Sequence, residues 1–232
     1  MTRVGYSYSE SVSLTSGVIQ RSCLGPLLFL VYINDVVELF CQGTICKLFA
    51  DDKLYCVIES SDDSDCLQSN LNKLSIWSKD WQLNISSTKS AYMRIGDRSG
   101  LPEAKYNISE TPLQRHYEYK DLDVVVNDKL KFSKHIDSIL AKARQRASLI
   151  YKCFVSRSPD LLARAFTTYV RPILEYACVV WNPVYVGLID KIESVQRQFT
   201  KRIPKISHLN YRDRLIFLNL DSLNSGGQKI ET

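Results

Sequence analysis

Hydrophobic and polar positions predict a first half that mixes short strands with helices. Residues 3–18 alternate polar side chains with Val, Tyr and Leu, which is typical of one or two short strands. An apolar run then predicts a helix from Leu27 to about Leu39, with Pro26 near its first turn. Ile45–Phe49 and Leu54–Ile58 are rich in apolar and β-branched residues. They predict a hairpin with an acidic tip.

A longer amphipathic helix follows this hairpin. Its apolar positions recur at three- and four-residue steps: Leu67, Leu71, Leu74, Trp77 (or Ser78) and Trp81. The polar stretch 59–65 offers residues that could cap its N-terminus. Residues 89–95 and 122–127 are strand-like, and the second of these segments has the stronger β-branched character.

After Ser133 the pattern becomes helical throughout. One apolar face predicts a long helix with Ser133 as its cap: Ile136, Ile139, Leu140, Ala143, Ala147 and Ile150. Ser158-Pro159-Asp160 predicts the start of another helix, which runs to about Val180 and is kinked or divided at Pro172. A third helix is expected over roughly 187–202. The fold class is therefore α+β, with a change of character near 128–133.

Composition indicates an ordinary globular protein, with 45% apolar and 24% charged residues. The longest apolar run, Leu24–Val37, is interrupted by polar residues and is shorter than the roughly 18 residues that a membrane span requires. The N-terminus also lacks the pattern of a signal peptide. We expect a protein of the nucleus or cytoplasm, neither secreted nor membrane-bound. The seven cysteines form no C-x-x-C pair, so we expect reduced thiols and no structural zinc site.

Charge is distributed unevenly along the chain. Residues 129–215 contain 17 Lys and Arg against 6 Asp and Glu, a net charge of +11, whereas residues 1–128 contain 12 against 17, a net charge of −5. A basic second half suits a protein that binds a polyanion, and an acidic first half suits one that binds cations. The alternative is that the basic side chains only solvate helix surfaces.

Two adjacent carboxylates, Asp51 and Asp52, occupy the predicted hairpin tip. Side by side they repel one another, and the fold does not require them. Mg²⁺ takes hard oxygen ligands and is usually held by one or two carboxylates together with substrate phosphates. A pair of such ions activates the attacking and leaving oxygens of phosphoryl transfer. Alone, the pair is equally compatible with a solvated turn, because Asp-Asp is common in turns.

The neighbouring residues favour the metal-binding interpretation. Three segments follow one another along the chain: Ser16-Gly17-Val18 with Gln20 and Gly25-Pro26, then Tyr32-Ile33-Asn34-Asp35, then Leu48-Phe49-Ala50-Asp51-Asp52. Together they resemble the palm of reverse transcriptases of non-LTR retrotransposons, especially the jockey-like group. The resemblance continues through four later segments: Trp77 to Lys89, Tyr119 to Ile136, Tyr169 to Trp181, and Glu193 to Arg202. It implies a partial polymerase palm over 1–130, a small antiparallel sheet with helices, and an all-helical thumb over 131–232.

The resemblance assigns roles to individual residues. Asp51 and Asp52 would be catalytic carboxylates that bind Mg²⁺, or Mn²⁺ in its place. Gln20, Ser22, Phe49 and Lys89 would line the nucleotide and template pocket. The partners implied are an RNA template paired with a DNA primer, and a dNTP. Five cations are our candidates for contact with the nucleic-acid backbone: Lys142, Arg144, Arg146, Lys152 and Arg164.

Departures from the family pattern argue against activity of this chain alone. The family places another carboxylate on a strand well before Ser16, and this sequence offers no convincing substitute. Arg21 and Asp123 replace glycines, and we expect Asp123 to lie within an apolar strand, where a charge is costly. We therefore expect an inactive fragment. The alternatives are a non-catalytic nucleic-acid-binding remnant and a decayed transposon copy.

Overall fold

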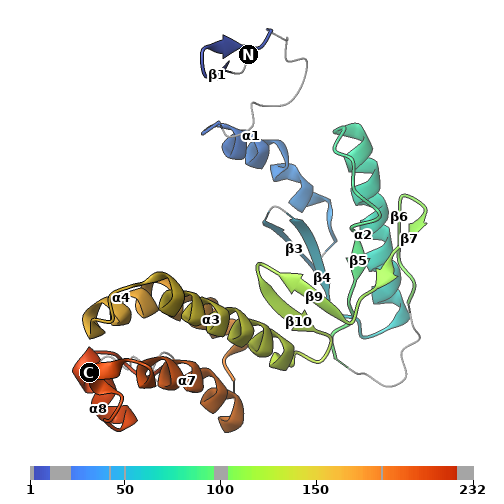
Figure 1. The fold of residues 1–232 in the computed structure, drawn as a ribbon. Coiled ribbons are helices and arrows are strands. Elements are labelled where there is room, and N and C mark those ends of the chain that lie inside the picture. The colour runs from blue at the N-terminus through green and yellow to red at the C-terminus, as the bar shows by residue number, and fades with distance from the viewer. Residues whose placement is uncertain are drawn as a thin grey trace, which may run out of the picture. The chain divides into compact units, whose positions relative to one another are not determined.

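The computed structural model describes residues 3–10, 22–41, 43–49, 51–96, 104–183 and 185–223. The chain divides into two compact units (Figure 1). Unit 1 comprises residues 1–92 and 98–114, and unit 2 comprises residues 93–97 and 115–232. Helices combine with two-stranded sheets, so the predicted α+β class is confirmed. Among the described helices, none is both long and apolar enough to cross a membrane.

Unit 1 contains small ladders around one long helix. Its elements are β1 (Arg3–Val4), β2 (Ser7–Tyr8), α1 (Gly25–Tyr32), the 3₁₀ helix η1 (Asn34–Leu39), β3 (Thr44–Phe49), β4 (Asp51–Cys56), α2 (Ser61–Asp80), β5 (Ala91–Tyr92), β6 (Asn107–Ile108) and β7 (Thr111–Pro112). β1 pairs with β2, β3 with β4 and β6 with β7, all antiparallel. β5 pairs with β8 (Gln114–Arg115). The predicted helix 27–39 is in fact α1 followed by η1.

Helix α2 organises unit 1. Ser60 and Asp63 form a capping box at its start, so the predicted polar cap region is confirmed. Leu71, Leu74 and Trp77 face the core, where they pack with Val36 of η1 and Ile108 of β6. Figure 1 shows α2 running beside the β6–β7 ladder. The three- and four-residue spacing of its apolar residues therefore identified the buried face of α2 correctly.

The β3–β4 hairpin is tighter than the sequence suggested. Phe49 pairs with Asp51, and Leu48 pairs with Asp52. Asp51 and Asp52 are therefore the first two residues of β4. The predicted hairpin is confirmed, but the prediction that Asp51 and Asp52 lie in a turn between its strands was wrong.

Unit 2 begins with a hairpin and continues as packed helices. Its elements are β9 (Glu118–Asp121), β10 (Val124–Asn127), α3 (Ser133–Cys153), α4 (Pro159–Tyr169), α5 (Arg171–Glu175), α6 (Cys178–Trp181), α7 (Val186–Lys201), the 3₁₀ helix η2 (Pro204–Ile206) and α8 (Tyr211–Leu218). Pro172 divides α4 from α5, as its ring and missing N–H require. Phe132, and not Ser133, occupies the N-cap position of α3.

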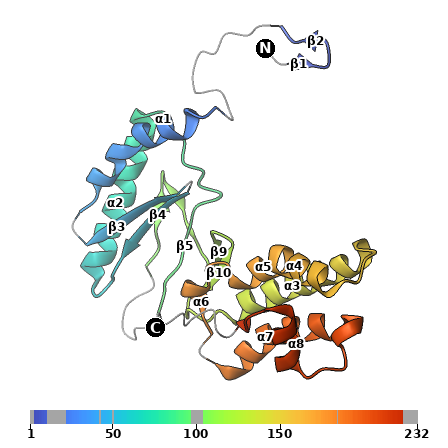
Figure 2. The ribbon, with the colours of Figure 1, turned by 90° about the vertical axis from the view of Figure 1, so that its left-hand side faces the viewer.

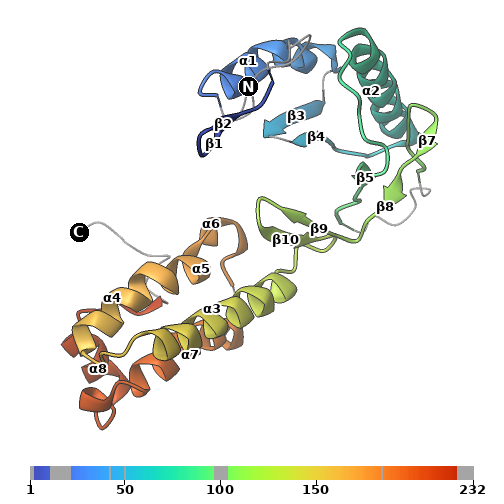
Figure 3. The same ribbon diagram turned by 45° about the horizontal axis from the view of Figure 1, so that its top comes forward.

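The core of unit 2 lies between α3, α4 and α7. Ile136 of α3, Leu162 and Phe166 of α4 and Phe199 of α7 are almost completely buried there. Figure 3 shows α3 and α7 lying side by side, and Figure 2 shows α4 and α5 beside α3. The hydroxyl of Tyr151 donates to the Phe199 carbonyl at 2.8 Å, which ties the end of α3 to α7.

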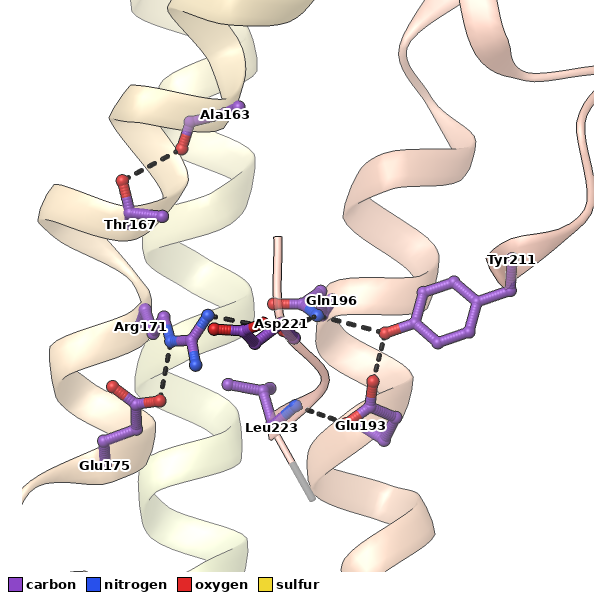
Figure 4. Close-up of polar contacts among 9 residues, drawn as sticks. All are labelled: Ala163, Thr167, Arg171, Glu175, Glu193, Gln196, Tyr211, Asp221 and Leu223. Carbon is purple, nitrogen blue, oxygen red and sulfur yellow. Dashed lines mark hydrogen bonds and ion pairs between the residues drawn. The ribbon is translucent and has the colours of Figure 1, made fainter. Parts of the chain in front are cut away.

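A buried polar network fastens the segment after α8 to these helices (Figure 4). The carboxylate of Glu193, only 2% exposed, accepts from the Tyr211 hydroxyl and from the Leu223 N–H at 2.9 Å. The Gln196 amide nitrogen donates to the Asp221 carbonyl at 3.0 Å, and Arg171 donates to the same carbonyl at 3.3 Å. Side chains from α5 and α7 thus hold residues 221–223 by their backbone.

Candidate functional site

The residues predicted for the nucleotide pocket all belong to unit 1. Asp51, Asp52 and Phe49 lie in the β3–β4 ladder, and their side chains lie outside the described part of the structure, as does Gln20. The Ser22 hydroxyl accepts from the Gly25 N–H at 3.0 Å, at the start of α1. Lys89 is exposed in the turn between α2 and β5, where its N–H donates to the Ser86 carbonyl at 3.1 Å. The roles of these residues in a shared pocket stay predictions.

Asp123 lies in a tight turn and not in a strand, so the prediction of a charge within an apolar strand was wrong. Leu122 and Asp123 have φ angles of 43° and 68° between β9 and β10. Two consecutive positive φ values, with Asp121 opposite Val124, describe a type I′ hairpin turn. Asp tolerates this backbone better than most residues, which explains why it can stand where the family has glycine. Arg21, the other departure, lies outside the described residues.

The Asp123 carboxylate is exposed and paired. It forms an ion pair with Lys120 and a longer one of 3.6 Å with Lys142 on α3. The hydrogen bond from Lys120 is the main reason why the pKa of Asp123 lies below its usual value. The residue therefore avoids the desolvation cost that a position inside a strand would have imposed.

A groove of about 390 Å³ lies within unit 2, between this turn, α3 and the region of α5. Its polar lining comes from Asp123, His135, Lys142, Gln145, Arg146 and Tyr176. The Tyr176 hydroxyl donates to the Leu122 carbonyl at 3.0 Å and so joins the residue after α5 to the hairpin turn. Two cations on one helix flank, open to solvent, make this groove the best candidate in unit 2 for contact with an anionic backbone.

His135 forms the buried side of the groove. Its Nδ1 accepts from the Val125 N–H at 3.3 Å, so the proton of the neutral ring lies on Nε2. That Nε2 atom is buried without a hydrogen-bond partner among the described residues, and the ring makes an edge contact with Trp181 at 5.3 Å. Burial lowers the pKa of His135, and the nearby Asp123 carboxylate opposes this effect. A neutral His135 therefore connects β10 to α3.

The five predicted backbone-binding cations are all exposed, but they do not share one face. Lys142 and Arg146 are four residues apart on α3 and line the groove together. Arg144 lies two residues from each of them, roughly 200° around the helix, on the opposite flank. Lys152 is near the end of α3, and Arg164 is on α4. The structure thus brings together two of the five residues.

Sequence reasoning missed the other members of the groove. The spacing of Lys142, Gln145 and Arg146 could have indicated a shared flank of α3. No local pattern connects Tyr176 or Asp123 to that flank, because the three segments meet only through the packing of unit 2.

Comparison with known proteins connects most of the chain to mobile-element polymerases. The chain is 30% identical over 206 residues, or 84% of its length, to the probable RNA-directed DNA polymerase from transposon X-element of Drosophila melanogaster. It is 25% identical over 208 residues to the RNA-directed DNA polymerase from mobile element jockey of the same species, again 84% of this chain. The jockey polymerase of Drosophila funebris is 27% identical over 82% of this chain.

These comparisons confirm the predicted resemblance to reverse transcriptases of jockey-like, non-LTR elements. The chain spans only 22–23% of the length of these three relatives. No protein-family profile matches the chain. No solved structure matches it either.

Proposed function

We propose that this chain is a segment of the RNA-directed DNA polymerase of a non-LTR retrotransposon, with part of the palm over 1–130 and the thumb over 131–232. The observation that carries the proposal is the similarity along 82–84% of the chain to three polymerases of mobile elements. In the order of the sequence, the carboxylate hairpin β3–β4 precedes the β9–β10 hairpin, which leads into a basic helical unit. The implied partners are an RNA template, a DNA primer and a dNTP.

The β3–β4 hairpin would supply the metal ligands of this polymerase. Carboxylates provide the hard oxygen donors that Mg²⁺ and Mn²⁺ prefer, and Asp51 and Asp52 are adjacent at the start of β4. When bound, the metal would stabilise the charge that develops on the oxygens of the transferred nucleotide. Among the described side chains, no group of three or more His, Cys, Asp or Glu lies close enough together to hold a metal ion. Asp51 and Asp52 remain our candidates for the ligands, because they are the adjacent carboxylates of the β3–β4 hairpin.

Paramagnetic Mn²⁺ tests this assignment directly. We expect added Mn²⁺ to broaden the backbone amide signals of residues 49–53, and Asp51→Asn to remove most of that broadening. Asp65→Asn, a change of the same kind at an exposed position of α2, should leave it unchanged. Broadening that persists in Asp51→Asn would contradict the proposed site.

We further propose that the segment alone does not extend a primer, since two neighbouring carboxylates make only part of a two-metal site. The purified chain, incubated with an RNA template, a DNA primer, dNTPs and Mg²⁺, should give no product above background. Template-dependent incorporation that is lost in Asp51→Ala would refute this expectation.

A second candidate function is nucleic-acid binding without catalysis, and the groove of unit 2 favours it. Lys142 and Arg146 lie on one flank of α3 and are free to meet phosphates, apart from the long ion pair between Lys142 and Asp123. Contacts of this kind would add affinity with little sequence preference. We expect binding to an RNA–DNA duplex that weakens as salt rises.

A pair of variants on the same helix tests this interface. Arg146→Ala should lower affinity for the duplex and reduce the slope of log K against log salt by about one. Arg144→Ala removes the same charge from the opposite flank of α3 and should change both quantities less. Equal effects of the two variants would argue for a diffuse charge effect and against this groove. Absence of binding, together with a non-cooperative melt, would favour a decayed copy.

A further inference from the structure

Two cysteines and a lysine meet in unit 1, outside the residues assigned to polymerase function. Cys41 lies between η1 and β3, whereas Cys66 and Lys73 lie on α2. The Lys73 ammonium donates to the Cys41 sulfur at 3.2 Å and to the Leu39 carbonyl at 3.3 Å. Cys66 precedes Lys73 by seven residues, or two turns, on the same face of α2, and its thiol is near enough to influence the pKa of Cys41. Both thiols are half-buried, so a small reagent can reach them from solvent.

Backbone contacts hold Cys41 in this position. The Cys41 N–H donates to the Asn70 side-chain oxygen at 3.3 Å. The Asn70 amide nitrogen in turn donates to the Thr44 hydroxyl at 2.9 Å, and Asn70 is completely buried. The segment that leads into β3 is thus attached to α2 one turn after Cys66, so the fold holds Cys41 beside the part of α2 that carries Cys66.

The two thiols have opposite electrostatic environments. The hydrogen bond from Lys73 is the largest influence that lowers the pKa of Cys41. Burial raises the pKa of Cys66, and the neighbouring Cys41 thiol acts in the same direction. The thiolate is the reactive form of cysteine, and a neighbouring ammonium favours it. Cys41 is therefore the nucleophile of the pair, and Cys66 is the resolving thiol, which reacts second.

We propose that Cys41 and Cys66 form an oxidation-sensitive pair, in which Cys41 reacts with a hydroperoxide and Cys66 then closes a disulfide. The Cys41 thiolate attacks the terminal oxygen of the peroxide, an S–O bond forms, the O–O bond breaks, and the leaving oxygen takes a proton. The Cys66 sulfur then attacks the sulfenic acid, an S–S bond forms, and the S–O bond breaks to release water. The two thiols supply the two electrons and two protons that convert the hydroperoxide to an alcohol (water, for hydrogen peroxide) and water.

The disulfide would join the segment before β3 to α2. Asp51 and Asp52 lie at the far end of the hairpin that this segment begins. Oxidation would therefore fix the base of the hairpin that carries the carboxylates, without altering the carboxylates themselves.

Peptide mapping of the peroxide-treated full chain tests the pairing. Under non-reducing conditions we expect a linked peptide that contains Cys41 and Cys66. Cys41→Ser or Cys66→Ser should abolish the link, whereas Cys153→Ser, at an exposed cysteine of unit 2, should retain it. A link from Cys66 to Cys56, or oxidation of Cys41 to the sulfonic acid without a link, would overturn the proposal.

Two further measurements test the order of the steps and the role of Lys73. In Cys66→Ser, a sulfenic-acid probe such as dimedone should label Cys41 after peroxide treatment, because the resolving thiol is absent. Lys73→Met should slow alkylation of Cys41 by iodoacetamide at pH 7 several-fold. Lys79→Met, near the end of the same helix, should leave that rate unchanged. An unchanged Cys41 rate in Lys73→Met would overturn the proposed activation.

Discussion

The Tyr211 hydroxyl reaches the buried carboxylate of Glu193, and Tyr211→Phe tests how much this contact stabilises unit 2. The substitution keeps the ring and removes one donor from a carboxylate that is 2% exposed. Glu193 would retain the Leu223 N–H at 2.9 Å. A hydrogen bond to a charged group contributes roughly 1.5–3 kcal/mol, so we expect a loss of about 2 kcal/mol.

A loss of this size is measurable in the full chain. It should lower the melting temperature of unit 2 by roughly 5–10 °C. Tyr169→Phe is the matched control, because Tyr169 is exposed on α4 in the same unit, and it should change stability by less than about 0.5 kcal/mol. Hydrogen exchange at the Leu223 amide should also accelerate in Tyr211→Phe, since the carboxylate that accepts from it is less firmly held.

A double-mutant cycle identifies the interaction itself. Glu193→Gln removes the charge, so Tyr211→Phe should cost less in that background than in the wild-type chain. Tyr211→Phe with wild-type stability, or effects of the two substitutions that simply add, would refute the reasoning from a buried carboxylate with two donors.

Three other substitutions have expected outcomes. Leu122→Asn should raise the free energy of unfolding by about 1 kcal/mol, because Asn tolerates the positive φ of the turn better than Leu. Urea denaturation measures this change, and a lower free energy of unfolding would contradict the turn geometry. Because the pKa of His135 is lowered in the folded protein, the stabilisation that depends on its neutral ring is fully present above pH 6.5 and is lost as the pH falls. His135→Gln should flatten this decline when the free energy of unfolding is measured from pH 7 to pH 5. Burial raises the pKa of Tyr151 from 10 to about 12, so the folded form loses stability as the pH rises through this range. Tyr151→Phe should lack that part of the alkaline loss of stability. The same dependence of stability on pH in Tyr151→Phe and the wild-type chain would argue against the buried hydroxyl.

Periodic elements were predictable from the sequence, because burial of one face imposes their pattern. Helix α7 begins and ends within one residue of the range expected from its apolar spacing. The division between α4 and α5 follows from Pro172, whose effect on a helix is local. Helix α8 was missed, because its pattern is reversed: Arg214 is buried and donates to the Leu209 carbonyl at 2.7 Å, while Phe217 is exposed.

The sites were less predictable than the elements. Lys142 and Arg146 could be selected as basic residues of one helix, but the groove exists only because a turn and α5 pack against them. The turn itself was hidden, because Leu-Asp is not a typical sequence for positive φ at two consecutive positions. Nothing in the sequence relates Cys41 to Lys73, because η1 and α2 bring them together through tertiary packing.

The pairing of β3 with β4 alone, within the described residues, has a consequence for how the chain behaves in concentrated solution. Each strand of a two-stranded ladder leaves an outer row of N–H and C=O groups open to a further strand. Ile45 and Tyr55 lie opposite one another and are both exposed, so the ladder also offers an apolar surface. Lys47 and Lys53 face each other two positions further along the ladder, on the same face, and like charges in that arrangement weaken the hairpin but repel an incoming strand. These lysines are therefore the residues whose removal would most readily convert the hairpin into a template for aggregation.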